Sequence, residues 1–305
     1  MNAGTVTVNR SNVQLDSPHA IPTTRKCHNG PMSVQLPDFL YGTAWKEERT
    51  AALTELALRT GFRGIDTANQ RKHYCEAGVG EGLAAAYRSG IATRDELFLQ
   101  TKFTDRRGQD HRLPYDASAK LATQVAQSLS SSLNHLKTDY VDSFILHGPV
   151  SNQAWTTADS EVWVAMGKER EAGRTRLLGV SNVGLHHLER MKSAGLELPT
   201  FVQNRCFARF GWDRDVRRFC SDNKIVYQAF SLLTANPEVL QHAPFVALAR
   251  SLGATPAQII FRFSRAIGIL PLTGSASEEH LRQDLASRDL ELTPDIVRAI
   301  ESIAA

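Results

Sequence analysis

A (β/α)8 barrel, also called a TIM barrel, is the α/β fold that this sequence predicts, and three observations support it. From about residue 37 onward, short β-type stretches alternate with amphipathic helical stretches. Eight such alternations fit into one mid-sized chain of 305 residues. Each expected strand also ends in a polar or aromatic side chain, and the carboxyl ends of barrel strands are where such folds place their chemistry.

The alternative fold is a doubly wound open sheet. Such a sheet usually carries a G-x-G-x-x-G segment directly after its first strand, where the segment opens a helix. The nearest approach in this chain is GVGEG at residues 78–82, which lies inside an expected helix. The barrel is therefore the favoured prediction.

The eight expected strands are short runs rich in β-branched and aromatic residues. They cover residues 39–43, 62–67, 97–103, 141–147, 176–180, 201–206, 225–230 and 269–273. The helices expected between them cover residues 46–60, 76–90, 117–136, 159–173, 184–194, 213–222 and 239–266, the last broken at 253–255. Two more, at residues 278–286 and 294–303, follow the last strand.

Turn residues support the ends of these helices. Gly61, Gly90, Gly173 and Gly195 stand where a helix should stop, since glycine readily adopts the left-handed conformation that ends one. The pair Thr293-Pro294 supplies a cap and a first-turn proline for the terminal helix.

Residues 1–34 are polar and show no periodicity. We expect a poorly ordered or loosely docked N-terminal tail, which could also cover the bottom of the barrel. Residues 35–305 are then expected to form a single barrel domain.

Composition excludes several classes of function. A net charge of +3 without a dense basic run indicates neither nucleic acid nor a membrane surface as a partner. No apolar run approaches the roughly 20 residues of a spanning helix, and the first residues do not resemble a signal peptide. The four cysteines have no metal-binding spacing. We expect a cytoplasmic protein without a metal, a monomer or weak homo-oligomer, acting on a small molecule.

Four side chains suit proton donation to a substrate. Asp66 ends the second expected strand, Tyr74 lies in the loop after it, and Lys102 and His147 end the third and fourth strands. A phenol has a pKa near 10, and we expect a nearby lysine ammonium to lower the pKa of Tyr74. Asp66 would keep that lysine charged, and His147 would orient a carbonyl oxygen. Such a set can protonate an oxygen that gains negative charge as hydride reaches its carbon.

Each of these residues also has a structural interpretation. Asp66 could be a loop hydrogen-bond acceptor, and Tyr74 could pack in the core or at the rim. Lys102 could expose its head group or form a Schiff base, as in an aldolase-type barrel. His147 could be a loop histidine or a metal ligand. Their placement on consecutive strands favours the joint catalytic hypothesis.

Six motifs in this order resemble the aldo-keto reductase superfamily, from about residue 36 to the C-terminus. They are GIDTA at 64–68, TKF at 101–103, ILHGP at 145–149, GVSN at 179–182, VQN at 202–204 and QAFS at 228–231. The resemblance implies an oxidoreductase that binds NADP(H) on the barrel and interconverts an aldehyde or ketone with an alcohol, without a metal.

The resemblance also implies roles for residues. Asp66, Tyr74, Lys102 and His147 would be the catalytic tetrad, with Tyr74 as general acid for reduction and base for oxidation. Residues expected to bind the cofactor are Gly42, Thr43, Ser181, Asn182, Gln203, Phe230, Ser231, Thr273, Gly274, Ser275, His280, Gln283 and Asp284. Among these, Ser181, Asn182 and Gln203 would hold the carboxamide, and Phe230 would stack on the nicotinamide ring.

Three departures from the family pattern carry information. The usual spacing Asp-Thr-Ala-x-x-Tyr would put Arg71 at the catalytic place, but the loop is a few residues longer here and we assign Tyr74. Leu272-Thr273 replaces a frequent Lys-Ser, and His280 stands where an arginine is common, so NAD(H) is an alternative to NADP(H). We expect no counterpart of the long C-terminal loop that narrows steroid-type pockets. Trp45, Trp155 and Arg205 are therefore our candidates for contacting the substrate.

Two other functions compete with the reductase. The chain could be a non-catalytic subunit that binds NADP(H) and a partner protein, which becomes the better hypothesis if Tyr74 lies far from Lys102. It could also be a Schiff-base barrel that uses Lys102. The pairing expected between Asp66 and Lys102 argues against the last alternative.

Overall fold

Eight parallel strands form a closed barrel in the computed structural model, which describes residues 25–27 and 34–303. The strands are β3 Leu40–Gly42, β4 Gly64–Asp66, β5 Phe98–Phe103, β6 Val141–Leu146, β7 Thr175–Ser181, β8 Phe201–Arg205, β9 Val226–Phe230 and β10 Leu270–Thr273. They pair in chain order, and β10 closes the ring by pairing with β3. The predicted (β/α)8 barrel is confirmed, and every expected strand overlaps an observed one.

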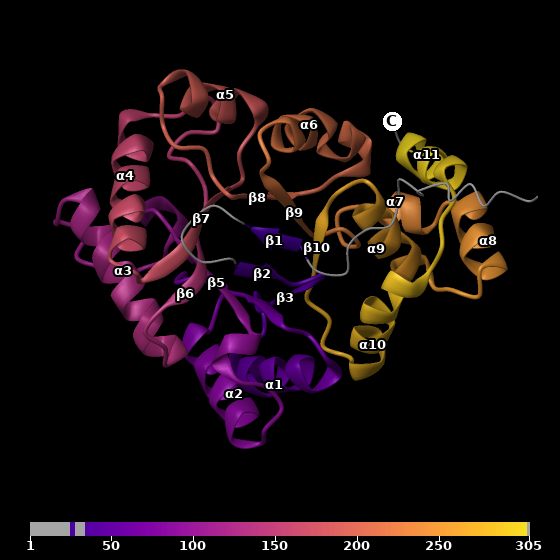
Figure 1. Ribbon diagram of the computed structural model, residues 1–305, viewed down its shortest axis with the longest axis horizontal. Helices are drawn as coiled ribbons and strands as arrows, with labels where there is room; N and C mark the ends of the chain where they lie inside the picture. Colours follow the sequence, from indigo (N-terminus) through magenta and orange to yellow (C-terminus); the bar gives the residue numbers. More distant parts are fainter. Residues whose placement is uncertain (1–24, 28–33, 304–305) are drawn as a thin grey trace, which may run out of the picture.

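The helices form a ring around the barrel (Figure 1). They are α1 Thr50–Thr60, α2 Glu76–Arg88, α3 Leu121–Leu136, α4 Thr157–Glu171, α5 Leu185–Ser193, α6 Arg214–Asp222, α7 Pro237–Leu240, α8 Ala243–Ser251, α9 Pro256–Ala266, α10 Glu278–Ala286 and α11 Pro294–Ser302. Short 3-10 turns cover Glu47–Arg49, Arg94–Glu96, Arg106–Gly108, Ala208–Asp213 and Ser287–Asp289. In the part of the chain that the structure describes, none of these helices has the length and apolar character to cross a membrane.

The stretch expected as one helix with one break contains three helices. The expected break separates α8 from α9, where the side chain of Thr255 caps α9 ahead of Pro256. A second break separates α7 from α8, because Pro244 in the first turn of α8 has no N–H to continue a preceding helix.

A small antiparallel sheet lies over one end of the barrel. Strand β1 Arg25–Cys27 pairs with β2 Val34–Leu36, and both appear in the middle of the ring in Figure 1. Val34 and Leu36 are buried together with Leu40, Phe98, Ile145, Leu177, Phe201 and Leu270. Four of those side chains come from the first residues of β3, β5, β8 and β10, so this apolar layer closes the amino-terminal end.

This arrangement differs in part from the expected tail. Residues 25–27 form a strand rather than part of a loose segment, because they pair with β2, whose apolar residues fill the barrel end. The rest of that expectation, for residues 1–24 and 28–33, lies outside the described residues.

Above the apolar layer the barrel interior is polar. Asp66, Gln100, Lys102, Gln203 and Gln228 are all buried and hydrogen-bonded to one another across the barrel. Polar groups at this depth require partners inside the protein. This hydrogen-bonded network lies between the apolar layer and the carboxyl-terminal end of the barrel, where the candidate site is located.

Candidate active site

A cavity of about 920 Å³, the larger cavity, opens at the carboxyl ends of the strands. Most of the side chains predicted to bind cofactor or substrate, or to act in catalysis, line it. They are Gly42, Trp45, Asp66, Tyr74, His147, Ser181, Asn182, Gln203, Arg205, Phe230, Ser231, Thr273, Gly274, Ser275, His280, Gln283 and Asp284. These residues come from the ends of seven of the barrel strands or from the segments that follow them. Strand β5 contributes none of them; its Lys102 is buried beneath the cavity.

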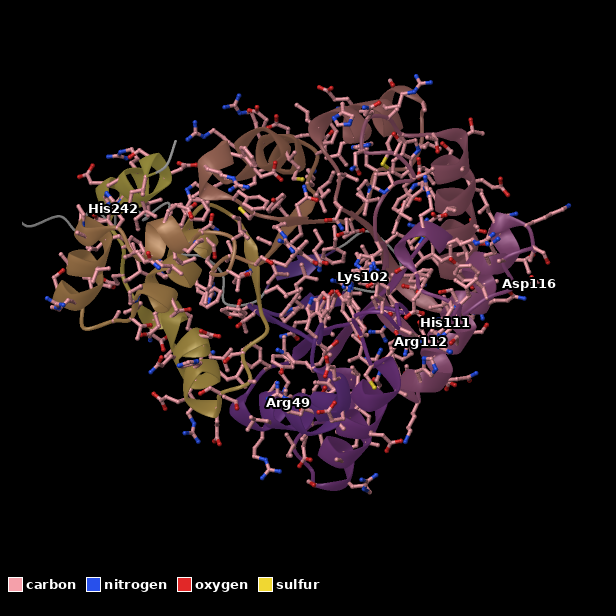
Figure 2. The ribbon with its side chains drawn as sticks, turned by 180° about the vertical axis from the view of Figure 1, so that it is seen from behind. Arg49, Lys102, His111, Arg112, Asp116 and His242 are labelled. Carbon is pink, nitrogen blue, oxygen red and sulfur yellow. The ribbon has the colours of Figure 1, made fainter. Side chains whose placement is uncertain are left out.

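Lys102 and Asp66 form a buried ion pair beneath the mouth. The Lys102 ammonium donates to the two carboxylate oxygens of Asp66 at 2.8 and 2.7 Å and to the carbonyl oxygen of Thr67 at 2.8 Å. Burial lowers the pKa of Lys102, and the Asp66 carboxylate opposes that shift. Figure 2, the view from behind, places Lys102 near the centre of the ring of helices.

Asp66 is held by further donors. The side-chain amides of Gln100 and Gln203 both donate to its Oδ1, at 2.7 and 3.0 Å. The backbone N–H and the hydroxyl of Thr43 both donate to its carbonyl oxygen at 3.0 Å. The carboxylate therefore has a fixed position, and it fixes the ammonium in turn.

Tyr74 lies against this pair. Its ring centroid is 5.3 Å from the Lys102 ammonium nitrogen and 5.9 Å from the His147 ring, which it meets edge-on. A turn brings the ring there: the N–H groups of His73 and Tyr74 both donate to the carbonyl of Gln70, at 3.2 and 3.0 Å. The structure thus brings together Tyr74, and not Arg71, with Lys102 and His147.

The pKa of Tyr74 shifts in the direction opposite to our expectation. Burial raises the pKa of this phenol, and the negative charge of Asp66 raises it further. We expected Lys102 to lower it, but the ammonium is neutralised by a carboxylate at hydrogen-bond distance. Tyr74 is consequently protonated at neutral pH, as a proton donor must be.

His147 is a neutral imidazole at pH 7. Burial, the positive charge of Lys102 and that of His73 together lower the pKa of His147 to about 3. Its Nδ1 is hydrogen-bonded to the Thr104 hydroxyl at 2.7 Å, and its carbonyl oxygen accepts from the Asn182 side chain at 2.7 Å. If Thr104 donates to Nδ1, the imidazole proton is on Nε2.

The residues expected around a nicotinamide are linked by hydrogen bonds. The Ser181 hydroxyl donates to the carbonyl of Gln203 at 2.6 Å, and the Gln203 amide donates to Asp66 and to Gln228. Asn182 has a left-handed backbone with φ 56°. Phe230 is half-buried in the wall, and the Arg205 guanidinium carbon lies 5.6 Å from its ring centroid.

The far end of the larger cavity is formed by the segment after β10 and the start of α10. The Thr273 hydroxyl donates to Asp284 at 2.8 Å, and burial raises the pKa of that carboxyl group to about 6. The Lys46 ammonium contacts the carbonyl oxygen of Gly274. Lys46 and Arg205 are the lysine and arginine residues in this lining, as far as the structure describes it.

Sequence reasoning missed Lys46 and misplaced two other residues. Lys46 follows Trp45 directly, and that position near the end of the first barrel strand was the available signal. Trp155, predicted at the substrate site, is instead buried and donates its indole N–H to Ser160 at 3.0 Å. It is not part of the cavity lining, because it packs in the core around the barrel. Thr43, predicted to bind cofactor, is also buried, where it positions Asp66.

A second cavity of about 520 Å³, the smaller cavity, adjoins the first. The two share Trp45, Gln70, His73 and Tyr74 as lining residues. The smaller cavity is bordered by the long loop between Asp66 and α2, and it also includes Arg112 and His135. Tyr74 therefore lies at the wall between two spaces, each large enough for a small ligand.

The described residues contain no group of three or more histidine, cysteine, aspartate or glutamate side chains that could hold a metal ion.

Comparisons with known proteins agree on one family. A family model, "Aldo/keto reductase family", matches residues 35–305. The chain is 28% identical over 278 residues to the "Uncharacterized oxidoreductase YtbE" of Bacillus subtilis, covering 90% of this chain and 91% of that one. It is 32% identical over 248 residues to an aldo-keto reductase of Mycolicibacterium vanbaalenii, covering 81% of this chain and 80% of that one.

A solved structure of an aldo/keto reductase from Brucella melitensis superposes with a TM-score of 0.76 at 26% identity, covering 92% of this chain and 98% of that one. The segment matched by the family model contains every site residue described above.

Proposed function

Because the chain belongs to the aldo/keto reductase family and is an oxidoreductase of carbonyl and alcohol groups, we propose that it transfers hydride reversibly between NADP(H) and a small aldehyde, ketone or alcohol, with Tyr74 as the general acid. The observation that carries this proposal is the position of the Tyr74 ring, in contact with His147 and 5.3 Å from the Lys102 ammonium. A protonated phenol at that place suits donation to a carbonyl oxygen.

The bound dinucleotide would supply the hydride for reduction and accept it in oxidation. Tyr74 gives its proton to the substrate oxygen as negative charge develops there. The phenolate that would remain lies beside the Lys102–Asp66 ion pair, with the ammonium nitrogen 5.3 Å from the ring centroid. In the oxidative direction Tyr74 takes the proton back from the alcohol. Asp66 keeps Lys102 charged and in place throughout, because it meets the ammonium with both carboxylate oxygens.

His147 orients the carbonyl oxygen. A neutral imidazole that receives a hydrogen bond from Thr104 on Nδ1 has its remaining proton on Nε2, which can donate to the substrate. A charged histidine would compete with Tyr74 as the proton source. The low pKa of His147 keeps these two roles separate.

The residues of the larger cavity fit a dinucleotide. A volume of about 920 Å³ is in the range of cofactor sites, and Phe230 offers a ring in the wall for stacking on the nicotinamide. Ser181, Asn182 and Gln203 would hold its carboxamide. Lys46, which contacts the carbonyl oxygen of Gly274, can meet the negative charge of a phosphate. Arg205, beside the ring of Phe230, stays a candidate for contacting the substrate. A Cβ added at Gly42 would lie 2.5 Å from Cδ2 of Leu272, so the Leu272 side chain would have to shift to admit a larger residue there.

The choice of NADP(H) rests on relatives. A silkworm aldo-keto reductase, 25% identical to this chain with a TM-score of 0.74 and covering 88% of this chain and 89% of that one, was solved in complex with NADP. Its likeness to this barrel supports the same cofactor here. NAD(H) is the competing cofactor, because Leu272 and Thr273 stand where Lys-Ser is frequent. We also propose that the protein is cytoplasmic and is a monomer or a weak homo-oligomer. Sedimentation analysis would test its association state.

The site geometry favours an enzyme over a non-catalytic NADP(H)-binding subunit. The subunit hypothesis gains if Tyr74 is remote from Lys102, and the two are close. A Schiff-base mechanism is disfavoured, because the Lys102 ammonium is engaged by three acceptor atoms.

A fluorescence titration with NADPH and with NADH, followed by a panel of aldehydes and ketones, tests the proposal. We expect saturable binding and consumption of the cofactor at 340 nm only when a carbonyl compound is present. Tight binding without turnover on any compound would instead support the non-catalytic subunit.

A further inference from the structure

The loop that carries Tyr74 is built into the barrel mouth at several points. The Trp45 N–H donates to the carbonyl of His73 at 2.7 Å, and the two rings stack with centroids 3.9 Å apart. The side chain of Gln70 donates to the carbonyl of Gly108 at 2.7 Å. These contacts hold the longer loop against its neighbours, so its residues form a fixed wall of the smaller cavity.

Arg71 is anchored in the same way through its backbone. Its carbonyl oxygen accepts from the Arg112 guanidinium at 2.7 Å, and Arg112 is itself bound by Asp110. The side chains of Arg71 and Lys72 are exposed. Neither has an ion pair or side-chain hydrogen bond with any residue in the described part of the chain.

Most of the acidic side chains near Arg71 and Lys72 are already in ion pairs with other residues. Asp110 pairs with Arg112, and the buried Glu76 accepts from the Thr101 hydroxyl at 2.5 Å and pairs with His135 at 3.1 Å. Within the described lining of the smaller cavity, Glu47 is the acidic residue left without an ion pair. Two unpaired cations against one unpaired acid give this wall an excess of positive charge.

The smaller cavity is placed where part of a substrate can extend, because Tyr74 lines both cavities. The dinucleotide requires the larger cavity, and the carbonyl group to be reduced must lie at Tyr74, which lines both. The remainder of a substrate can extend from Tyr74 into the smaller cavity. Arg71 is three positions from Tyr74, so their Cα atoms are at most about 10 Å apart, which limits the reach of the substrate.

We propose that the smaller cavity binds the body of the substrate and selects short aldehydes or ketones that carry a carboxylate or a phosphate, with Arg71 and Lys72 binding the anionic group. This inference rests on the proposed reductase function. It assigns a role to the loop residues by which this chain departs from the Asp-Thr-Ala-x-x-Tyr spacing.

Matched pairs of substrates test the inference. Succinic semialdehyde is compared with butanal, and glyceraldehyde 3-phosphate with glyceraldehyde, each with saturating NADPH. We expect kcat/KM to be at least tenfold higher for the anionic member of one pair or both, mainly through a lower KM. The semialdehyde and the phosphate arms distinguish a carboxylate substrate from a phosphate substrate. Raising the ionic strength should reduce the preference, because exposed charges are screened.

Two variants test whether Arg71 and Lys72 cause the preference for anionic substrates. In the double variant Arg71→Gln/Lys72→Gln, the ratio of kcat/KM for the anionic to the neutral member should fall about tenfold. The matched control is Arg250→Gln, an exposed arginine on α8 outside both cavities, which should leave that ratio within twofold of the wild type.

Failure of this inference and failure of the proposed reductase function give different results. Reduction of the neutral compounds with no preference for the anionic ones, or a preference that survives the double variant, overturns the inference and leaves the reductase function standing. Absence of NADPH oxidation with every compound overturns the proposed function together with the inference.

Discussion

Asp66→Asn should expose how far the barrel depends on its buried ion pair. The substitution leaves the Lys102 ammonium, whose side chain is 1% exposed, without a counter-charge. Breaking a buried pair on one side costs about 3–5 kcal/mol of unfolding free energy. The side-chain NH₂ of the new asparagine is a hydrogen-bond donor. It would face other donors, those of Gln100, Gln203 or Lys102, because Asp66 accepts from all three. At about 2–3 °C per kcal/mol for a domain of this size, the melting temperature should fall by about 10 °C.

The pH dependence of the loss identifies its cause. Burial already lowers the pKa of Lys102, and removal of the carboxylate lowers it further. Lys102 then holds its proton more strongly in the unfolded state than in the folded state. The free energy of unfolding of the variant therefore rises with pH, from the lowered pKa of the folded state up to the pKa of about 10.4 of the unfolded state. Urea denaturation at pH 7 and pH 9.5 should show a smaller difference from wild type at the higher pH.

Two further variants complete the experiment. Asp66→Asn/Lys102→Met removes both charges and should be more stable than Asp66→Asn alone, since no unpaired ion remains. Glu55→Gln breaks an exposed pair with Arg59, whose side chain is 61% exposed, and should cost less than about 1 kcal/mol. The reasoning is refuted if the free energy of unfolding of Asp66→Asn lies within about 1 kcal/mol of the wild-type value, or if Asp66→Asn/Lys102→Met is no more stable than Asp66→Asn.

Two other predictions follow from the site. Phe230→Ala should weaken NADPH binding by about 1 kcal/mol or more through lost stacking, measured by fluorescence titration; an unchanged dissociation constant argues against Phe230 as the platform. The pKa of His147 is about 3 in the folded protein and near 6.5 when unfolded, so the contribution of His147 to stability is present above pH 6.5 and declines toward pH 3, by at most about 1.4 kcal/mol per pH unit. Wild type should therefore lose more stability between pH 6.5 and 4.5 than His147→Gln does, and parallel losses would contradict this.

The barrel and three of the four catalytic candidates are predictable from sequence for a physical reason. Parallel strands deliver whatever follows their last apolar residue to the same end of the sheet. Asp66, Lys102 and His147 stand at such positions, so their meeting follows from strand order alone. Phe230 and Ser181 are located by the same argument, and both line the larger cavity.

The conformations of the loops were harder to predict from the sequence than the residues at the strand ends. The choice between Tyr74 and Arg71 depends on a turn around the Gln70 carbonyl, which no spacing rule gives. Trp155 looks like a pocket residue in sequence, but it packs inward because its indole N–H finds Ser160 within the same helix start. The sign of the Tyr74 pKa shift likewise depends on burial and on the closeness of the ion pair.

The short strand β1 could not be foreseen either. Residues 25–27 are polar and their pairing with β2 is a tertiary contact at the closed end of the barrel. Lys46 was overlooked because a lysine at a strand end is usually solvated, and its contact with Gly274 joins segments 228 residues apart.

Tyr74→Phe, with Tyr140→Phe as the matched control, tests the central claim most directly. Both remove one phenolic hydroxyl, but Tyr140 lies beside Arg94 and Arg176, outside both cavities. With a neutral aldehyde, Tyr74→Phe should lower kcat by at least about 100-fold, the scale of a lost general acid, while the NADPH dissociation constant stays within twofold. Turnover by Tyr74→Phe at a rate close to that of Tyr140→Phe would show that another group provides the proton.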